Sequence, residues 1–239
     1  LEHVNEQGQV QEPKGSIGST MYNQAYVTTF LAHAYRYNKQ EKSLARLKQA
    51  AGVILECQND EGAWRYQLKK ADGDSSVTAC AVVALQAAKE AGVEVPQEAF
   101  DKSLAYLRKL QNEDGGFGYT MVGTGSAFPR SAVAAFALSA AGEKEQAAAE
   151  KARNYLLRLQ PTDKAASSGF FLHGHLSTVQ LMCGDSNSNL KSGQEWRSAL
   201  VSELARQQKE GGEWTDTFLG PEYATATACI ILQWRKAGG

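Results

Sequence analysis

The chain has 239 residues, of which 43% are hydrophobic and 21% are charged, and its 25 Lys and Arg nearly balance its 26 Asp and Glu. This composition predicts a soluble globular protein with one sizeable core and argues against nucleic-acid binding driven by phosphate neutralisation. No uninterrupted apolar run reaches the ~18–20 residues that cross a bilayer, so we expect no transmembrane segment and leave the compartment, cytoplasmic or exported after signal removal, open.

Apolar residues recur at the 3.6-residue spacing of a helix along most of the chain. The expected helices cover 20–37, 40–58, 75–91, 96–111, 127–141, 143–160, 169–183, 193–209 and 222–236. No segment alternates as a strand would, so the predicted fold class is all-α. We expect 1–19 to be the tail of a preceding repeat and a linker, and 20–239 to be a single domain.

One phrase recurs at a step of roughly fifty residues, which indicates a repeat architecture. A Leu or Ile lies four residues before a Gln, and acidic residues, glycines and an aromatic follow. The copies begin at Gln58 ("QNDEGAW"), Gln111 ("QNEDGGF"), Gln160, whose tail "PTDKAASSGF" diverges, and Gln208 ("QKEGGEW"). A degenerate copy opens the chain, with Asn5 in the place of the Gln.

The expected helices alternate in character. Those that end at the Gln carry charge along one face, whereas their partners, such as "SSVTACAVVALQAAKEAG", are rich in Ala, Val and Cys. A helix that is apolar nearly all round must be buried on most sides, and a striped helix can face water. The pattern therefore predicts two layers, an α/α toroid of about four and a half helix hairpins. The Gln amide would bond to free backbone groups at a helix end, and Trp64, Phe117 and Trp214 would pack between repeats.

The phrase resembles the QW-type repeat of terpenoid cyclases (the squalene cyclase repeat) and of protein prenyltransferase β subunits. The repeat is intact around Gln58 and Gln208, and "QNEDGGFGY" and "PEYATATACIILQ" look like bacterial prenyltransferase and squalene-oxidase repeat proteins. The resemblance implies a toroid that binds an isoprenoid or other lipid-like ligand. A full toroid of this family has six helix pairs, so we expect this one to be open or truncated at its N-terminus. Self-association through the N-terminal repeat edge is a further hypothesis.

Squalene-type cyclases protonate an alkene with an Asp in an Asp-x-Asp-Asp-Thr-Ala motif, and this motif aligns with residues 74–79. Asp74 keeps the first acid, but Ser76 and Val77 replace the central pair. Asp72 is an extra carboxylate, so Asp72 and Asp74 are candidate catalytic residues. The alternative is that Asp74 caps a helix while Asp72 is a solvated loop acid.

Protein prenyltransferases hold Zn²⁺ with an Asp, a Cys and a His, and "FFLHGHLSTVQLMC" resembles the His-bearing segment. His173 is the best match and His175 follows it, but the preceding inner segment "SAFPRSAVAAFAL" contains neither Asp nor Cys. The sequence therefore gives no strong prediction of a cofactor. Zinc is a weak prediction, with His173 as its candidate ligand. The alternative is that both histidines supply polar groups inside a cavity or bond to a neighbouring helix.

Polar and aromatic residues stand near the starts of the inner helices, where helix dipoles favour an anionic group. The predicted ligand-binding residues are Tyr22, Asn23, Arg130, His173, His175, Glu222 and Tyr223, beside Asp74. The first hypothesis is a toroid that binds an isoprenoid or lipid-like ligand with an anionic head in its central cavity. The second is a non-catalytic protein-interaction module that uses the rim or the open repeat edge. A third class, carbohydrate-active toroids, would pair Asp74 with Glu222. Enzymatic activity is left undecided.

Overall fold

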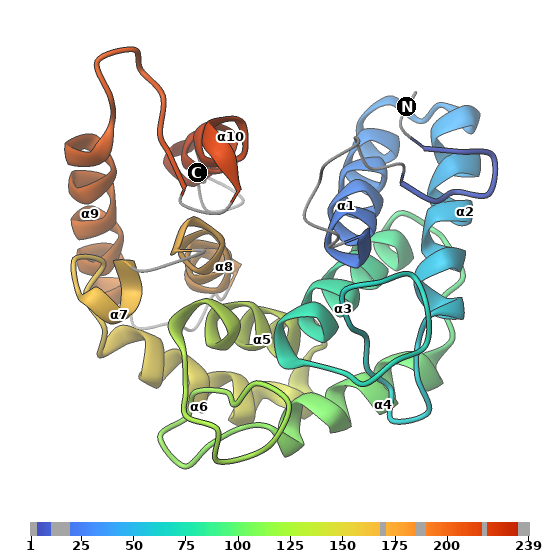
Figure 1. Cartoon of the computed structure of the whole chain (residues 1–239), viewed down its shortest axis with the longest axis horizontal. Helices are drawn as coiled ribbons and strands as arrows, with labels where there is room; N and C mark the ends of the chain where they lie inside the picture. The colour runs from blue at the N-terminus through green and yellow to red at the C-terminus, as the bar shows by residue number, and fades with distance from the viewer. Residues whose placement is uncertain (1–3, 11–19, 168–170, 185–189, 217–218, 234–239) are drawn as a thin grey trace. The chain divides into compact units, whose positions relative to one another are not determined.

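A computed structural model describes residues 4–10, 20–167, 171–184, 190–216 and 219–233 (Figure 1). The helices are α1 (Thr20–Asn38), α2 (Glu41–Glu56), α3 (Ser75–Glu90), α4 (Gln97–Lys109), α5 (Phe128–Ala140), the 3-10 helix η1 (Glu143–Glu145), α6 (Gln146–Leu157), α7 (Lys164–Ser167), α8 (Phe171–Gly184), α9 (Leu190–Gln207) and α10 (Gly220–Gln233). Extended pairing in these residues is limited to the isolated bridges Val4 with Val10 and Gln111 with Phe117. The all-α prediction is confirmed. None of the described helices is long and apolar enough to cross a membrane.

The expected helix boundaries hold within a few residues, with two differences. The segment expected as one helix over 143–160 is divided into η1 and α6, and the short helix α7 was not expected. Residues 169–170 and 234–236, which the sequence assigned to helices, lie outside the described residues.

Two compact units are distinguished, and the first consists of Leu1–Leu110 and Tyr119–Val122. In this unit α1 packs along α3 and α2, and α3 also packs against α4 and α2. Ten of the sixteen residues of α3 are buried and they lie around most of the helix, whereas the six buried residues of α4 form one stripe. The predicted contrast between buried and striped helices is therefore present.

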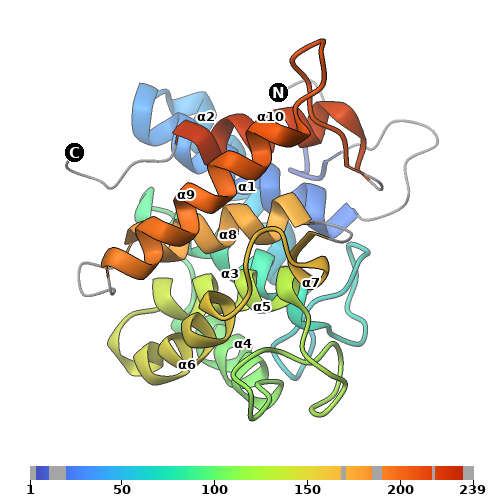
Figure 2. The same cartoon turned by 90° about the vertical axis from the view of Figure 1, so that its left-hand side faces the viewer.

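The second unit consists of Gln111–Gly118 and Gly123–Gly239. Here α5 packs against α6 and α8, α8 packs against α10, and α9 lies against α6 and α8 (Figures 1 and 2). Eight of the thirteen residues of α5 are buried, as expected for an Ala-rich inner helix.

The recurring phrase forms the same hydrogen-bonded turn in its copies at Gln58, Gln111 and Gln208, and we call this turn a corner (residues 58–64, 111–117 and 208–214). The Gln58 amide donates to the carbonyls of Gly62 (3.1 Å) and Ala99 (2.9 Å), and the Gln111 amide donates to those of Gly115 (3.1 Å) and Ala148 (2.9 Å). The Gln208 amide repeats the bond inside its own corner, to Gly212 (2.8 Å). The Gln amides bond to backbone carbonyls, as predicted, but these carbonyls are not ones left free at a helix end. They belong to the turn of the same corner and, for Gln58 and Gln111, to the first turn of the next outer helix.

The aromatic residue of each corner is buried and is held by hydrogen bonds of its indole, of its backbone N–H, or of both. The indoles of Trp64 and Trp214 donate to the carbonyls of Ile54 (2.7 Å) and Leu204 (2.8 Å). The N–H groups of Trp64 and Phe117 donate to hydroxyls fourteen residues further on, those of Thr78 and Ser131. The inner helix thus supplies one bond to each of these two corners.

Residues 4–10 form a further corner, but its register differs by one residue from the sequence prediction. Asn5 takes the position of Asn59 rather than that of the Gln, because Asn5 bonds to Gln9 and Gly8 as Asn59 bonds to Ala63 and Gly62. Val4 therefore stands where Gln58 stands in the next copy. The missing amide is supplied by Gln24 of α1, which donates to the carbonyls of Gly8 (2.8 Å) and Ala50 (3.1 Å).

The divergent copy at Gln160 replaces the corner by another arrangement. The Gln160 N–H donates to the side chain of Asp163 (2.7 Å), and α7 follows. The indole of Trp196 in α9 donates to the carbonyl of Leu159 (2.8 Å). An indole from another helix thus satisfies a carbonyl at the end of this segment.

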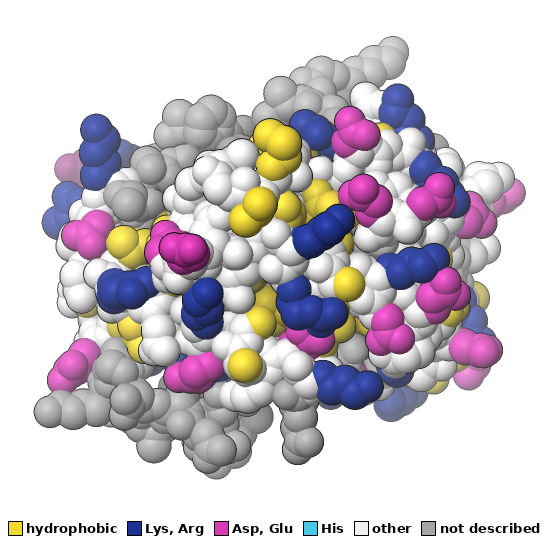
Figure 3. All heavy atoms as spheres, turned by 90° about the horizontal axis from the view of Figure 1, so that it is seen from below, with side chains coloured by type: hydrophobic (Ala, Val, Ile, Leu, Met, Phe, Trp, Pro, Cys, Tyr) yellow, Lys and Arg dark blue, Asp and Glu magenta, His cyan; other side chains and the backbone are white. Residues whose placement is uncertain are grey.

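Charged side chains of both signs are interspersed on the surface. On the face drawn in Figure 3, Lys and Arg side chains lie among Asp and Glu side chains rather than in a patch of their own. This distribution accords with the near balance of 25 basic and 26 acidic residues.

Candidate functional site

Asp74 is the N-cap of α3 and is fully buried. Its Oδ1 accepts hydrogen bonds from the N–H groups of Ser76 (3.0 Å) and Val77 (2.9 Å) and from the Ser76 hydroxyl (3.0 Å). No hydrogen-bond partner of its buried Oδ2 lies among the described residues. Burial raises the pKa of Asp74, although these bonds act in the opposite direction. Such a carboxyl holds its proton more tightly than usual, which disfavours the transfer of a proton to an alkene.

Asp72, the other predicted acid, is exposed and makes no hydrogen bond with Asp74. The two carboxyl groups therefore lie in different environments, one buried at the start of α3 and one at the surface. Asp74 meets the description of a helix cap, and Asp72 that of a solvated loop acid.

Tyrosines gather around Asp74 in the first unit. Burial is the largest cause that raises the pKa values of Tyr22, Tyr66 and Tyr106, and the negative charge of Asp74 adds to it; that of Tyr106 reaches about 12. The rings of Tyr22 and Tyr66 have centroids 6.3 Å apart. The sequence placed Tyr22 and Asp74 in one site, and the structure brings them into one cluster.

Tyr66 and Tyr119 support the guanidinium of Arg65. Their hydroxyls are hydrogen-bonded to each other, and the Arg65 guanidinium carbon lies 5.6 Å from the centroid of each ring. The Tyr119 carbonyl also accepts from the N–H of Ser75, at the start of α3 (3.0 Å). Rings from two successive repeats therefore contact this arginine.

A row of aromatic residues runs along α1 and begins at Tyr22, in the tyrosine cluster around Asp74. Its members, Tyr22, Tyr26, Phe30, His33 and Tyr37, recur at helical spacing on one face. The folded protein leaves Tyr26 38%, Phe30 65% and Tyr37 94% exposed. The buried residues of α1 lie on its opposite face, so the row forms the more exposed side of this helix.

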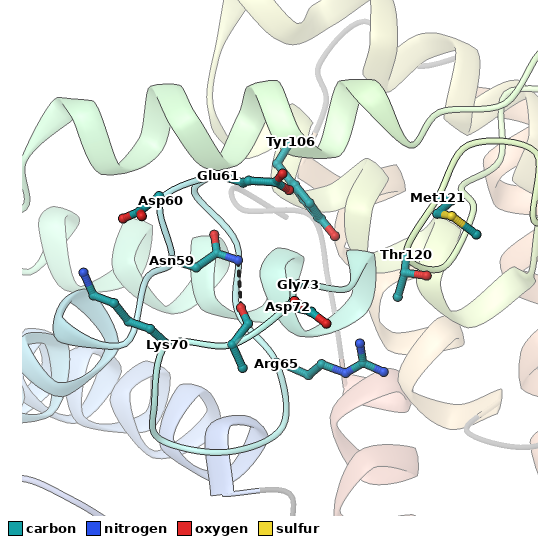
Figure 4. Close-up of a pocket in the computed structure, with 11 residues that line it drawn as sticks. Asn59, Asp60, Glu61, Arg65, Lys70, Asp72, Gly73, Tyr106, Thr120 and Met121 are labelled. Carbon is teal, nitrogen blue, oxygen red and sulfur yellow. Dashed lines mark hydrogen bonds between the residues drawn. The ribbon is translucent and has the colours of Figure 1, made fainter.

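An open pocket of about 610 Å³ lies beside the loop between α2 and α3 (Figure 4). Its lining is mainly polar: Asn59, Asp60, Glu61, Arg65, Lys70, Ala71, Asp72, Gly73, Tyr106, Thr120 and Met121. All of these residues belong to the first unit. Figure 4 shows Glu61 and Tyr106 above the opening, Arg65 below it, and Thr120 and Met121 at one side.

Arg130, predicted to bind an anion, is engaged by backbone groups of its own unit. Its Nε donates to the Phe117 carbonyl (2.8 Å) and its Nη2 donates to the Gly125 carbonyl (2.7 Å). These two bonds attach Arg130 to the loop that leads into α5 and use two of its five N–H donors.

The predicted histidines lie on α8 in the second unit. His175 is 1% exposed, and its ring lies 4.9 Å from that of Phe128 and 5.5 Å from that of Trp196. Burial lowers the pKa of His175 to about 3 and that of His173 to about 4, so both are neutral at pH 7. In the part of the chain that the structure describes, no three His, Cys, Asp or Glu side chains lie close enough to hold a metal ion.

The remaining predicted residues lie near helix starts. Asn23 is exposed on α1, Glu222 is exposed in the first turn of α10, and Tyr223 beside it is half-buried. Asn23 lies in the first unit and the other two in the second.

The sequence reading missed Arg65, Tyr66, Tyr106 and Tyr119. A signal for two of them was present, because a Tyr stands two residues after the corner aromatic in both "GAWRY" and "GGFGY". Tyr66 and Tyr119 are separated by 53 residues, which is one repeat step. Equivalent residues of adjacent repeats lie close in a repeat protein, so this coincidence predicts their contact.

Comparison with known proteins gives a family and a fold. Residues 3–212 match the family described as the prenyltransferase alpha-alpha toroid domain. A search of curated proteins finds no match. A solved protein from Actinoplanes is similar at 20% identity and a TM-score of 0.74, over 100% of this chain and 72% of that one. The type II terpene cyclase MstE from Scytonema is similar at 19% identity and a TM-score of 0.48, over 90% of this chain and 78% of that one. A point variant of that cyclase has been solved in complex with the substrate geranylgeranyl dihydroxybenzoate.

Proposed function

Because the chain belongs to the prenyltransferase α/α-toroid family, we propose that it binds an isoprenoid or other lipid-like ligand with an anionic head along the aromatic row of α1. The observation that carries the proposal is that large apolar side chains on this row remain exposed, Tyr26 at 38% and Phe30 at 65%. Exposed apolar surface of this kind is a common mark of a ligand or partner site.

The row has a polar end, which suits an amphipathic ligand. Tyr22 begins the row and lies beside Tyr66, where hydroxyl groups and the buried Asp74 are found. The ligand's tail would lie along Tyr26 and Phe30, and its head would lie at the Tyr22 end. The amides at the start of α3 are already capped by Asp74, so a head group would draw on tyrosine hydroxyls instead.

The proposal is one of binding and does not include alkene protonation. Burial raises the pKa of Asp74, and Ser76 and Val77 stand where the cyclase motif has acids. An alkene is a very weak base, so its protonation needs a stronger acid than a buried carboxyl of raised pKa.

The test is titration of the full chain with farnesol, farnesyl diphosphate and palmitate, followed by native mass spectrometry and tyrosine fluorescence. Phe30→Ser is compared with Met121→Ser, because both side chains are 65% exposed in the first unit. A Phe side chain buries about 200 Å², so covering half of the exposed part at about 25 cal/mol per Å² contributes ~1.6 kcal/mol, or about fifteenfold in Kd.

We expect Phe30→Ser to weaken binding about fifteenfold and Met121→Ser to leave it unchanged. Tighter binding of the diphosphate than of the alcohol supports the anionic head. Absence of saturable binding by all three probes contradicts the proposal. Dimers lost on Phe30→Ser without any probe binding would instead assign the row to protein interaction.

A further inference from the structure

We propose that the pocket beside the α2–α3 loop binds a small zwitterion, a molecule of amino-acid or short-peptide size that carries both an ammonium and a carboxylate group. The pocket is separate from the aromatic row of α1, and the proposal does not rest on the lipid ligand. Its volume of about 610 Å³ lies within the range of small-molecule sites.

The charged groups around this pocket make no ion pair among the described residues, although the Arg65 charge acts on Asp74 and that of Asp60 on Lys102. Five of its lining residues are acidic or basic: Asp60, Glu61, Asp72, Arg65 and Lys70. Among the described residues none of the five makes an ion pair or a hydrogen bond through its charged group. Arg65 has two ring contacts, and its charge also acts on Asp74 and Tyr106. By contrast, other charged pairs of this unit are joined, as Lys102 is to Glu98 (2.8 Å).

Arg65 is the preorganised group of the site. Its guanidinium rests against Tyr66 and Tyr119, and those rings are fixed by the bond between their hydroxyls. These contacts restrict the side chain before a ligand arrives, so less of its entropy is lost on binding. A planar guanidinium held this way presents its N–H groups to a carboxylate in a fork geometry that lysine lacks.

The acceptors for an ammonium lie across the opening. Glu61 and Tyr106 lie above it and Arg65 lies below it in Figure 4, with Asp72 between them. Tyr106 is only 6% exposed as a whole, so its hydroxyl is held by packing at the wall. Thr120 adds a hydroxyl, and Met121, which is 65% exposed, adds an apolar wall on one side for a side chain or methylene groups.

The balance of charge selects a zwitterion over a simple ion. Three carboxylates face two cations, so a phosphate or another pure anion would be repelled by Asp72 and Glu61 near Arg65. A pure organic cation would meet Arg65 at close range. A ligand that carries both signs gives each group an opposite charge, and only such a ligand uses Arg65 and the acids together.

The binding test uses the full chain and four probes followed by calorimetry: alanyl-methionyl-alanine, its N-acetyl form, its C-terminal amide and free methionine. Charged hydrogen bonds differ from neutral ones by roughly tenfold or more in affinity, so we expect either cap to weaken the tripeptide at least tenfold. Similar binding of free methionine would place the ligand among amino acids, and weaker binding would place it among peptides.

The variants assign each pole. In Arg65→Gln the free tripeptide and its amide should bind equally, and in Glu61→Gln the free tripeptide and its acetylated form should bind more nearly alike. Lys69→Gln, an exposed neighbour that does not line the pocket, should bind as the wild type does. Circular dichroism checks that Arg65→Gln is folded, and Glu61→Gln alters only an exposed side chain.

The proposal is overturned if none of the four probes binds, if capping changes nothing, or if inorganic phosphate binds more tightly than the tripeptide in an Arg65-dependent manner. Each of these outcomes leaves the lipid titration of the α1 row unaffected, so the two proposals fail separately.

Discussion

Replacing Gln24 by Leu tests the corner at residues 4–10 directly. Gln24 is fully buried, and its amide donates to the carbonyls of Gly8 (2.8 Å) and Ala50 (3.1 Å) while its Oε1 accepts from the N–H of Val10 (2.9 Å). The Leu side chain fills a similar space but offers no polar atom. Three hydrogen bonds between this side chain and the backbone would then be lost at once.

The expected cost follows from these three bonds. Each contributes roughly 1 kcal/mol net, so the variant should lose ~3 kcal/mol of unfolding free energy in the first unit. If the corner separates from α1 in the variant, water can bond to the backbone groups that Gln24 had bonded, and the loss of unfolding free energy stays at about 3 kcal/mol, as roughly 1 kcal/mol per bond gives. The matched control is Thr28→Val, because Thr28 is equally buried but its hydroxyl bonds only to the Gln24 carbonyl of its own helix (2.7 Å).

Hydrogen exchange of single amides provides the assay. The Val10 amide should be protected in the wild type and in Thr28→Val, and it should exchange rapidly in Gln24→Leu. Urea unfolding of the same proteins gives the change in free energy. Retention of Val10 protection together with unchanged stability in Gln24→Leu would refute the assigned role of this side chain.

Two further predictions concern the corners and the start of α3. Gly62 has φ +86°, and a Cβ there would lie 2.5 Å from the backbone of Lys102, whereas Gly92 has φ +92° and open space around it. We therefore expect Gly62→Ala to lower the free energy of unfolding by ~2 kcal/mol more than Gly92→Ala does, as measured by urea unfolding. Equal losses in the two variants would contradict this packing. For Asp74, burial raises the folded-state pKa, so its protonated form favours the folded state below the usual pKa of 3.8, and this advantage is lost as pH rises through the raised value. The thermal midpoint of the wild type relative to Asp74→Asn should thus fall as pH rises from 3 upward, and a constant or rising difference would show that the sign is wrong.

The fold was predictable because its two signals, the recurring Gln phrase and the apolar pattern of each helix, are local in the sequence and repeat along it. The step between Gln58 and Gln111 and the contrast between "SSVTACAVVALQ" and its charged neighbour needed no long-range information, and both are confirmed by hydrogen bonds and burial. The register of the first corner was not predictable in the same way. Its amide comes from Gln24, on the helix that follows, so a search among the residues before the glycine could not find it.

The candidate site was predicted only in part, for a physical reason. Tyr22 and Asp74 were found because polar residues at helix starts stand out against apolar runs. Arg65 and Tyr106 were not found because one lies in a loop and the other lies on the buried stripe of α4, and only folding brings them to one pocket. The predicted ligand roles of Arg130 and His175 remain predictions, and each side chain also has a packing or bonding role.

What the corners at Gly8 and Gly62 share is a turn carbonyl that accepts a hydrogen bond from a side-chain amide, and the position of that amide in the sequence differs between them. Gln58 donates this bond from the end of the helix before the turn. Gln24 donates it from the helix after the turn, sixteen residues beyond Gly8. Thr78 and Ser131 stand at the same distance from Gly62 and Gly115 and also serve their corners. Degenerate copies in related chains should therefore be sought as a glycine with a polar residue at that downstream distance, even where the glutamine of the consensus is gone.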